Sequence, residues 1–468
     1  MTPVPFRISQ RTAILVLIGL WLATSACLLV LNASLIMPMS FRDPDDALRL
    51  VQVRDLLNGQ SWFDLTQYRL HPPEGVPMHW SRLVDVPLAA MIALLTPIVG
   101  QAWAERTTLI AVPLLELLAL FAIVYAICRA LALHRGIALT AVALLGTSAT
   151  ILIQFAPMRI DHHATQILFG GLALLALMHP QQRDGRMGLF AGLAMAAWLQ
   201  VSLEGLPMTV AMGAVFGLRA LWSETWRADL PAYLLALTGL SALLLFGTHY
   251  PGAALVFWCD AMSPSFLLPL VATTLTLILA QRILPSSSRL MRAVPMGLAG
   301  IAGAVAYISL SRQCLAGPFE TLAPIVYSLW YQAVLEGMPV SAQAPDMQAM
   351  LLLPGLIGFP GTLLALRRAS TENARMAWLS LLFIELASFA LSLNVMRAMC
   401  FAHFVALPGV AVLLSTLARQ AQRLQIMPLR VVLTASVAIL SPSVLIFIAA
   451  SLMDTDADQP NAEGKVER

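Results

Sequence analysis

The sequence predicts an all-α polytopic membrane protein, because of its composition and its long apolar runs. Of the 468 residues, 59% are hydrophobic and only 11% are charged, and the mean hydropathy is +0.79. Soluble proteins carry about 25% charged residues, so this chain could not cover a water-exposed surface. Apolar stretches of roughly 20 residues recur along the chain, each long enough to span a bilayer as a helix. The sequence does not show the short alternating segments of a membrane β-barrel.

The apolar runs between polar breaks predict about thirteen transmembrane helices. The first, 12–37, is too long for a cleaved signal peptide and is expected to be retained. A polar stretch, 38–85, follows. The next segment, 86–100, is apolar but short and proline-flanked, and we expect it to be partly inserted or to lie along the membrane. The remaining spans are predicted near 107–132, 137–157, 163–180, 187–203, 205–222, 231–249, 264–281, 293–311, 349–366, 376–395, 399–418 and 430–452.

The distribution of charge predicts the orientation of these helices, because basic residues concentrate in cytoplasmic loops. With the N-terminus inside, seventeen of the 28 basic residues fall in inner loops, together with only four acidic residues. The alternation requires that 187–222 be two helices that turn at 202–205. The C-terminus is then outside, and 38–100 and 312–348 are outer loops.

The domain organisation is simple. Residues 1–452 are predicted to form one transmembrane domain, and 453–468 are predicted to be a short, acidic, disordered tail. Five cysteines are scattered, mostly in apolar stretches, without the paired spacing of a disulfide framework or a zinc site. We therefore expect them to be small buried side chains.

Three carboxylates lie within four residues of the first outer loop, at Asp43, Asp45 and Asp46. Like charges this close repel one another, and the repulsion grows near the low-dielectric membrane. A divalent cation such as Mg²⁺ or Mn²⁺ would relieve it, because these ions prefer carboxylate oxygens as ligands. The same residues also fit a helix N-terminus with Asp43 as its cap and Pro44 in its first turn.

A second candidate site, Asp161-His162-His163, lies at the outer end of the third predicted span. Asp161 and His163 could bind one cation through a carboxylate and an imidazole, a pair of ligands that suits Mn²⁺. A capping aspartate beside interfacial histidines fits the same residues equally well.

Two further candidates lie in later outer loops. Glu336 is an acidic residue in 312–348, where Glu320 competes with it. Arg397 could clamp a phosphate group with both of its terminal nitrogens, or anchor the chain at the membrane boundary. Under the topology predicted from charge, all of these candidates fall on the same side of the membrane. Glu116 and Glu385 lie inside predicted spans, where charged groups are costly, and receive no assignment.

These motifs, in this order, resemble the single-chain catalytic subunit of oligosaccharyltransferases and, more broadly, the GT-C class of membrane glycosyltransferases. The stretch from Asp43-Pro44 to Arg49 is similar to the family's first acidic motif, and Asp161-His162-His163 is similar to its second. Trp62-Phe63-Asp64 and the stretch 72–80 are similar to the family's loop element. The first motif and this loop element add three loop candidates: Arg49, His79 and Trp80. The resemblance is strongest over roughly 38–165. The family's C-terminal globular domain, with its tryptophan-tryptophan-aspartate motif, is not expected in this chain.

The resemblance implies transfer of a sugar or oligosaccharide from a polyprenyl-phosphate or polyprenyl-diphosphate donor, on the non-cytoplasmic face of a bacterial inner membrane. No nucleic-acid partner is implied. It implies three sets of site residues: ligands of a divalent cation, Mn²⁺ or Mg²⁺ (Asp43, Asp45, Asp46, Asp161 and His163), catalytic residues (Asp43, Asp46 and Glu336), and contacts to the donor phosphate (Arg397 and His162).

Several alternatives stay open at this point. The sequence decides neither the sugar, nor the cation, nor which aspartate of the first motif is catalytic. The acceptor could be a peptide, a lipid or a growing glycan. The competing function is a transporter or flippase for an anionic or polyprenyl-linked lipid, and a non-catalytic assembly subunit is a third possibility.

Overall fold

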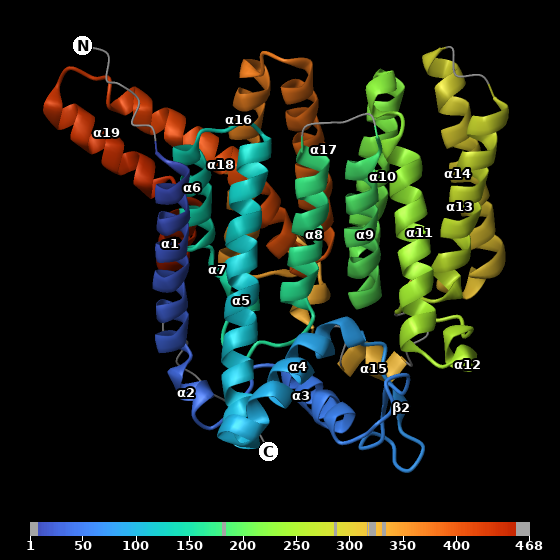
Figure 1. Cartoon of the computed structure of the whole chain (residues 1–468). Helices are drawn as coiled ribbons and strands as arrows, with labels where there is room; N and C mark the ends of the chain where they lie inside the picture. Colours follow the sequence, from blue (N-terminus) through green and yellow to red (C-terminus); the bar gives the residue numbers. More distant parts are fainter. Residues whose placement is uncertain are drawn as a thin grey trace, which may run out of the picture.

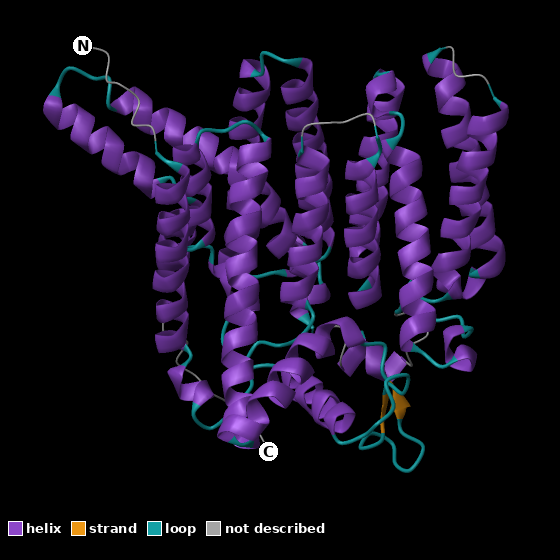
Figure 2. Cartoon of the chain, in the orientation of Figure 1, coloured by secondary structure: helices purple, strands orange, loops and turns teal. Residues whose placement is uncertain are grey.

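Long apolar helices stand side by side in an upright bundle, with a smaller layer of short helices and loops below it (Figures 1 and 2). This computed structural model describes residues 8–179, 184–284, 288–315, 317, 324–329 and 334–454. Two short strands, β1 (Thr66–Gln67) and β2 (Val76–Pro77), pair antiparallel in the lower layer.

The helices of the bundle correspond to the predicted spans, except that the spans predicted at 137–157 and 430–452 are each broken into two helices, with bends of 64° and 81°. They are α1 (Gln10–Leu31), α5 (Gln101–Ala130), α6 (Arg135–Leu145), α7 (Ala149–Leu152), α8 (His163–Met178), α9 (Arg186–Val201), α10 (Leu206–Trp222), α11 (Asp229–Thr248), α13 (Pro264–Ile283), α14 (Arg289–Leu310), α16 (Pro345–Arg368), α17 (Glu372–Asn394), α18 (Met399–Ala421), α19 (Met427–Ile439) and α20 (Pro442–Asp454). The remaining helices are α2 (Ala33–Ile36), α3 (Pro44–Leu57), α4 (Arg82–Val99), α12 (Pro251–Ala254) and α15 (Pro324–Leu329).

The all-α polytopic fold class is confirmed. Within the described residues, ten helices are long and apolar enough to cross a membrane, and two bent pairs, one of them starting at α6 and the other at α19, reach that length together. The predicted spans near 163–180 and 187–203 are the shorter apolar helices α8 and α9. Helix α4 passes the same test of length and composition, but Figure 1 shows it lying below the upright helices beside α3, as expected for 86–100.

The predicted turn at 202–205 is present. Helix α9 ends at Val201, a 3-10 turn covers Leu203–Gly205, and α10 starts at Leu206. At the far end of α10, Arg219 Nη1 donates to the carbonyl oxygen of Leu177, 2.9 Å away, at the end of α8. Helices α8 and α10 therefore run in the same direction, which requires α9 to run back between them.

The upright helices pack closely where both partners carry glycine. A Cβ atom added at Gly361 of α16 would lie 1.8 Å from the carbonyl oxygen of Gly409 in α18. Small residues at such contacts let two backbones approach, which is how helices associate inside a bilayer. The lower layer has its own apolar core, in which Leu50 and Val53 of α3 contact a cluster that includes Leu88 of α4.

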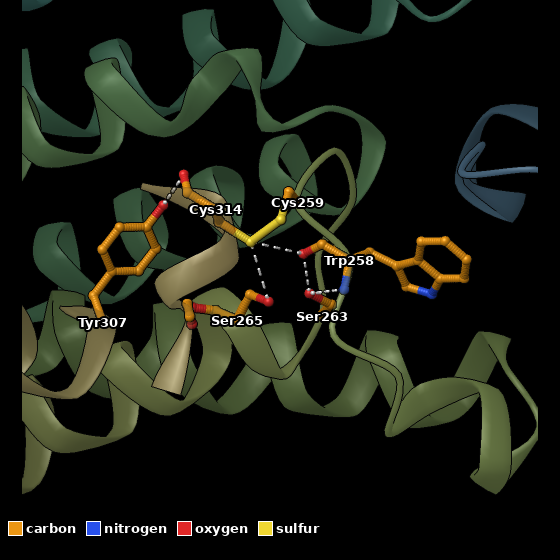
Figure 3. The surroundings of a disulfide bond; sticks show 7 residues. Trp258, Cys259, Ser263, Ser265, Tyr307 and Cys314 are labelled. Atoms are coloured by element: carbon orange, nitrogen blue, oxygen red, sulfur yellow. Dashed lines mark hydrogen bonds between the residues drawn. A yellow bond between two sulfur atoms is a disulfide. The ribbon is translucent and has the colours of Figure 1, made fainter. Parts of the chain in front are cut away.

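The expectation that no cysteine is paired is wrong. Cys259 and Cys314 form a disulfide, with their Cα atoms 5.2 Å apart and a sequence separation of 55 (Figure 3). Because α13 and α14 are antiparallel, the loop before α13 and the loop after α14 lie at the same end of the pair. No local spacing in the sequence signals that approach. Cys27, Cys128 and Cys400 are free. Cys128 and Cys400 are buried as predicted, whereas Cys27 is exposed, because it lies on a face of α1 that packs against no other helix in the described residues.

The disulfide can be tested by counting thiols. Denatured protein that has not been reduced should react with an alkylating reagent at three of its five cysteines, and reduced protein at all five. Intact-mass spectrometry of the labelled chain reads this count directly. Five labels before reduction, in protein purified with its free thiols protected, would contradict the pairing.

Candidate functional site

The first acidic motif forms the N-terminus of α3 and also contacts the second motif. Asp43 caps the helix, because its side chain accepts a hydrogen bond from the Asp45 backbone N–H at 3.0 Å. Asp46 is 1% exposed, and its Oδ1 accepts from the backbone N–H groups of Ile160 and Asp161 at 2.7 and 3.0 Å. The capping role and the approach to the second motif therefore occur together.

Arg159 lies at the centre of these carboxylates. Its Nη1 is 2.8 Å from Asp43 Oδ2 and 3.1 Å from Asp46 Oδ2, and its Nη2 is 2.6 Å from Asp161 Oδ2. The guanidinium thus joins the two acidic motifs through three ion pairs. Sequence reasoning did not assign Arg159 to the site, because nothing in the local sequence shows which way its side chain points.

The local electrostatics favour a cation. Burial raises the pKa of Asp46 to about 7, and the nearby Asp161 carboxylate adds to this rise. Burial also raises the pKa of Asp45, with further increases from Asp43 and Asp161. Although burial opposes it, the carboxylates of Asp161 and Asp46 raise the pKa of Arg159 and keep it charged. Three carboxylates thus share one guanidinium, with Asp45 close to them, and this excess of acidic groups attracts additional positive charge.

The histidines of the second motif lie beside Glu204. One ligand atom from each of His162, His163 and Glu204 lies within 4.8 Å of the other two. His163 Nε2 is 3.7 Å from Asp161 Oδ2. The buried Nδ1 of His162 has no hydrogen-bond partner among the described residues, and burial lowers the pKa of this imidazole well below its usual value. Neutral imidazoles next to carboxylates suit Zn²⁺ and Mn²⁺, so the residues present fit a divalent cation.

Glu204 also connects this cluster to the late arginine. Arg397 Nη1 lies 2.6 Å from Glu204 Oε1 and 4.0 Å from Glu336 Oε1. Gln166 Nε2 donates to the other oxygen of Glu204 at 3.3 Å, and Trp198 Nε1 donates to Gln166 at 3.2 Å. Glu204 was predicted only as part of the turn at 202–205. Its acidic side chain within an apolar stretch was the signal that could have identified it.

The loop candidates Arg49 and Trp80 belong to a separate buried group. Arg49 Nη1 lies 3.0 Å from Asp85 Oδ1, and its guanidinium lies 4.3 Å from the centre of the Trp80 ring. Arg82 pairs with the other oxygen of Asp85 at 3.0 Å, and all four side chains are at most 5% exposed. These contacts connect α3 to α4. The neighbouring His79 has a pKa lowered by burial, although Asp260 acts to raise it.

The remaining acidic candidates lie elsewhere or are not described. Glu116 Oε1 accepts a hydrogen bond from the Thr165 hydroxyl at 3.1 Å, two residues after His163 in α8. Glu385 is 1% exposed and lies in the middle of α17, near Gly358 of α16. Glu320 lies outside the described residues, so only Glu336 can be related to Arg397.

Comparison with known proteins was made at the levels of sequence and structure. No protein-family model and no curated protein sequence matches this chain. Among solved structures, the archaeal oligosaccharyltransferase AglB from Archaeoglobus fulgidus, in complex with an inhibitory peptide and a dolichol-phosphate, matches with a TM-score of 0.68 at 17% identity over 94% of this chain. The apo form of the oligosaccharyltransferase from the same organism gives 0.65 at 16% identity over 95% of this chain.

A third structure of the Archaeoglobus fulgidus oligosaccharyltransferase, a complex with Zn and sulfate, gives a TM-score of 0.58 at 16% identity over 95% of this chain. This chain spans 55 or 56% of the length of these solved chains. These matches show the fold of this chain, a polytopic bundle of membrane-spanning helices. More closely, that fold is similar to the fold of the matched part of the solved oligosaccharyltransferases.

The central role of Arg159 can be tested by its replacement. Arg159→Gln leaves three carboxylates without their shared partner, and breaking a buried pair in this way costs on the order of 3 kcal/mol. We expect a lower midpoint of thermal unfolding, with part of the loss recovered in Mn²⁺ or Zn²⁺. Arg42→Gln is the matched control, because Arg42 is exposed beside the same cluster. An equal loss in both variants would contradict the central role of Arg159.

Proposed function

We propose that this protein is a membrane glycosyltransferase that moves a sugar or an oligosaccharide from a polyprenyl-phosphate or polyprenyl-diphosphate donor to an acceptor on the non-cytoplasmic face. The observation that carries the proposal is the meeting of the two acidic motifs with Glu204, Glu336 and Arg397 at one end of an oligosaccharyltransferase fold. These groups come from segments more than 350 residues apart in sequence.

The chemistry requires that negative charge on the leaving phosphate be neutralised as the bond to the anomeric carbon breaks. A bound divalent cation supplies such charge as a Lewis acid. The proposed ligands are Asp43, Asp45, Asp46, Asp161 and His163, to which the geometry adds His162 and Glu204. The Zn bound in a related structure and the two imidazoles here support a cation of this class.

Arg397 is proposed to bind the donor phosphate. Its Nη1 is held by Glu204, while its Nε is buried without a hydrogen-bond partner among the described residues. A guanidinium binds phosphate oxygens through two parallel hydrogen bonds, so this side chain retains donors for the purpose. His162, on the other side of Glu204, is a second proposed contact.

Glu336 and the aspartates of the first motif are proposed to orient the acceptor and to remove its proton. Asp46 is occupied by two backbone N–H groups and Arg159, which supports a role in holding the cluster. The Glu336 side chain is 42% exposed at the edge of the site, where an incoming acceptor can reach it. A positioned carboxylate contributes general base catalysis of about 10²–10⁴-fold.

The disulfide supports the proposed orientation. Cys259 and Cys314 lie in loops at the same end of the bundle as the candidate site, and disulfides persist in oxidising compartments. We therefore propose that the site faces the periplasm or the exterior. Two related structures hold a peptide, one an inhibitory peptide and the other a tethered acceptor peptide, which supports a peptide as the first acceptor to test, before lipids and glycans. The transporter alternative is less well supported, because transporters bind their substrates near the bilayer midplane and these charges meet at one end.

The first prediction concerns transfer activity. Asp161→Ala removes the carboxylate that contacts both Arg159 and His163, and we expect transfer from a polyprenyl-linked donor to fall roughly 100-fold or more. Transfer is measured in detergent with membrane-extracted donor lipids and a panel of peptide, lipid and glycan acceptors. Asp55→Asn is the control, because Asp55 lies on the same helix but pairs with the exposed Arg69. Undiminished transfer by folded Asp161→Ala protein would falsify the proposed function.

The second prediction concerns the metal. Protein stripped by a strong chelator should lose transfer activity, because the carboxylate-rich site then lacks positive charge to neutralise the leaving phosphate. Activity should return on addition of Mn²⁺, Mg²⁺ or Zn²⁺, and the order of recovery identifies the preferred ion. Metal content is checked by elemental analysis. Full activity in protein shown to contain no divalent metal would exclude metal dependence while leaving the glycosyltransferase proposal open to the first test.

A further inference from the structure

A cavity of about 150 Å³ lies at the end of the bundle opposite the candidate site. It is enclosed by the last residues of α5, α8 and α10 and by the first turns of α17. Its lining includes His179, Arg219, Trp226, Thr371, Asn373 and Ala374. Thr371 and Asn373 are exposed, so the cavity opens toward solvent or lipid headgroups at this end.

Arg219 gives this cavity a buried positive charge. The side chain is 3% exposed, its Nε donates to Ser380 Oγ and its Nη1 to the Leu177 carbonyl oxygen, both at 2.9 Å. Both acceptors are neutral, and among the described contacts Nη2 makes no hydrogen bond. The Asp229 carboxylate interacts electrostatically with this guanidinium, and no hydrogen bond between the two is described. A guanidinium placed this deep without a hydrogen-bonded anion is costly, which favours binding of one.

The first turn of α17 adds to the attraction for an anion. The Thr371 side chain caps the Ala374 N–H at 3.2 Å, and the Arg375 N–H donates to the Thr371 carbonyl oxygen at 2.9 Å. The N–H groups of Glu372 and Asn373 have no acceptor within the helix. The N-terminal end of this 23-residue helix also carries the positive end of its dipole. Glu372 is the acidic residue in the same turn, and its carboxylate accepts a hydrogen bond from the exposed Trp222 at 3.1 Å.

We propose that this cavity binds a phosphate group, held by Arg219 and the first turn of α17. The volume is below the 300–1,000 Å³ of pockets for organic ligands, and suits a small anion. A guanidinium and a helix N-terminus are both established partners of phosphate oxygens. The phosphate belongs either to a phospholipid of the leaflet at this end or to a free anion. The site is separate from the proposed active site and does not depend on the proposed function.

Thermal unfolding of the full chain in a neutral detergent tests this site. Inorganic phosphate, titrated at constant ionic strength, should raise the unfolding midpoint of the wild type in a saturable way, because a ligand that binds only the folded state stabilises it. Arg219→Gln should lose this rise. Arg368→Gln is the matched control, because it removes one positive charge at the same end of the bundle but outside the cavity, where Arg368 Nη1 donates to Thr416 Oγ1 at 3.4 Å. This variant should keep the phosphate-dependent rise of the unfolding midpoint.

A second variant covers the case in which Arg219→Gln fails to fold. Ala374→Leu fills the cavity but leaves the guanidinium in place, and it should also lose the phosphate response. No response in the wild type overturns the proposal, and so does an undiminished response in folded Ala374→Leu or Arg219→Gln protein.

The source of the phosphate is identified by native mass spectrometry. The protein is incorporated into nanodiscs of phosphatidylglycerol and phosphatidylcholine and then transferred to detergent. Retention of one phosphatidylglycerol by the wild type and by Arg368→Gln, with its loss in Ala374→Leu, supports a lipid headgroup. A saturable response to inorganic phosphate without retained lipid supports a free anion.

Discussion

The balance of charge around Arg159 is the constraint on which the rest of the candidate site depends. Three carboxylates from α3 and from the loop before α8 can lie this close only because one guanidinium pairs with all of them. Near the apolar bundle the Coulomb energy of unpaired like charges is several times its value in water. Asp46 makes a second connection between α3 and that loop, because its Oδ1 accepts hydrogen bonds from two backbone N–H groups of the loop. The same interactions therefore fix the start of α3 and the start of α8.

A second chain of polar contacts extends the site to the last third of the sequence. Glu204, at the turn between α9 and α10, lies among the histidines and also pairs with Arg397, 193 residues later. Glu204 has two carboxylate oxygens and uses both, one for Arg397 and one for Gln166. A ligand that takes Arg397 as its phosphate partner would compete with Glu204 for that guanidinium. Glu204 would then be available to a cation, which couples binding of the donor phosphate to the charge of the site.

Much of the fold follows from local properties of the sequence, whereas much of the site does not. Each span was predictable, because the cost of exposing polar groups to lipid is set by each apolar segment itself. The role of Asp43 as a helix cap was also predictable, because capping depends on the residues next to it in sequence. Arg159 was not assigned and Cys259 was expected to be unpaired, because their partners are chosen by tertiary packing. Glu204 was predictable in part. An acidic residue in an apolar stretch indicates a functional role, but its partners are set by the tertiary packing around the turn that follows α9.

The membrane-embedded helices also control the geometry of the loop that carries Arg159. The bent pair that begins with α6 turns by 64° at its break, and α7 leads directly into that loop. Helix α7 is held in place by His403 of α18, whose Nδ1 lies 2.8 Å from Thr150 Oγ1 and whose Nε2 lies 3.1 Å from the Leu351 carbonyl oxygen. Nε2 donates to that carbonyl, and in the neutral imidazole Nδ1 then accepts from the Thr150 hydroxyl. A buried, fully bonded histidine thus connects α7, α16 and α18, so the site rests on a rigid support within the bundle rather than on the loops alone.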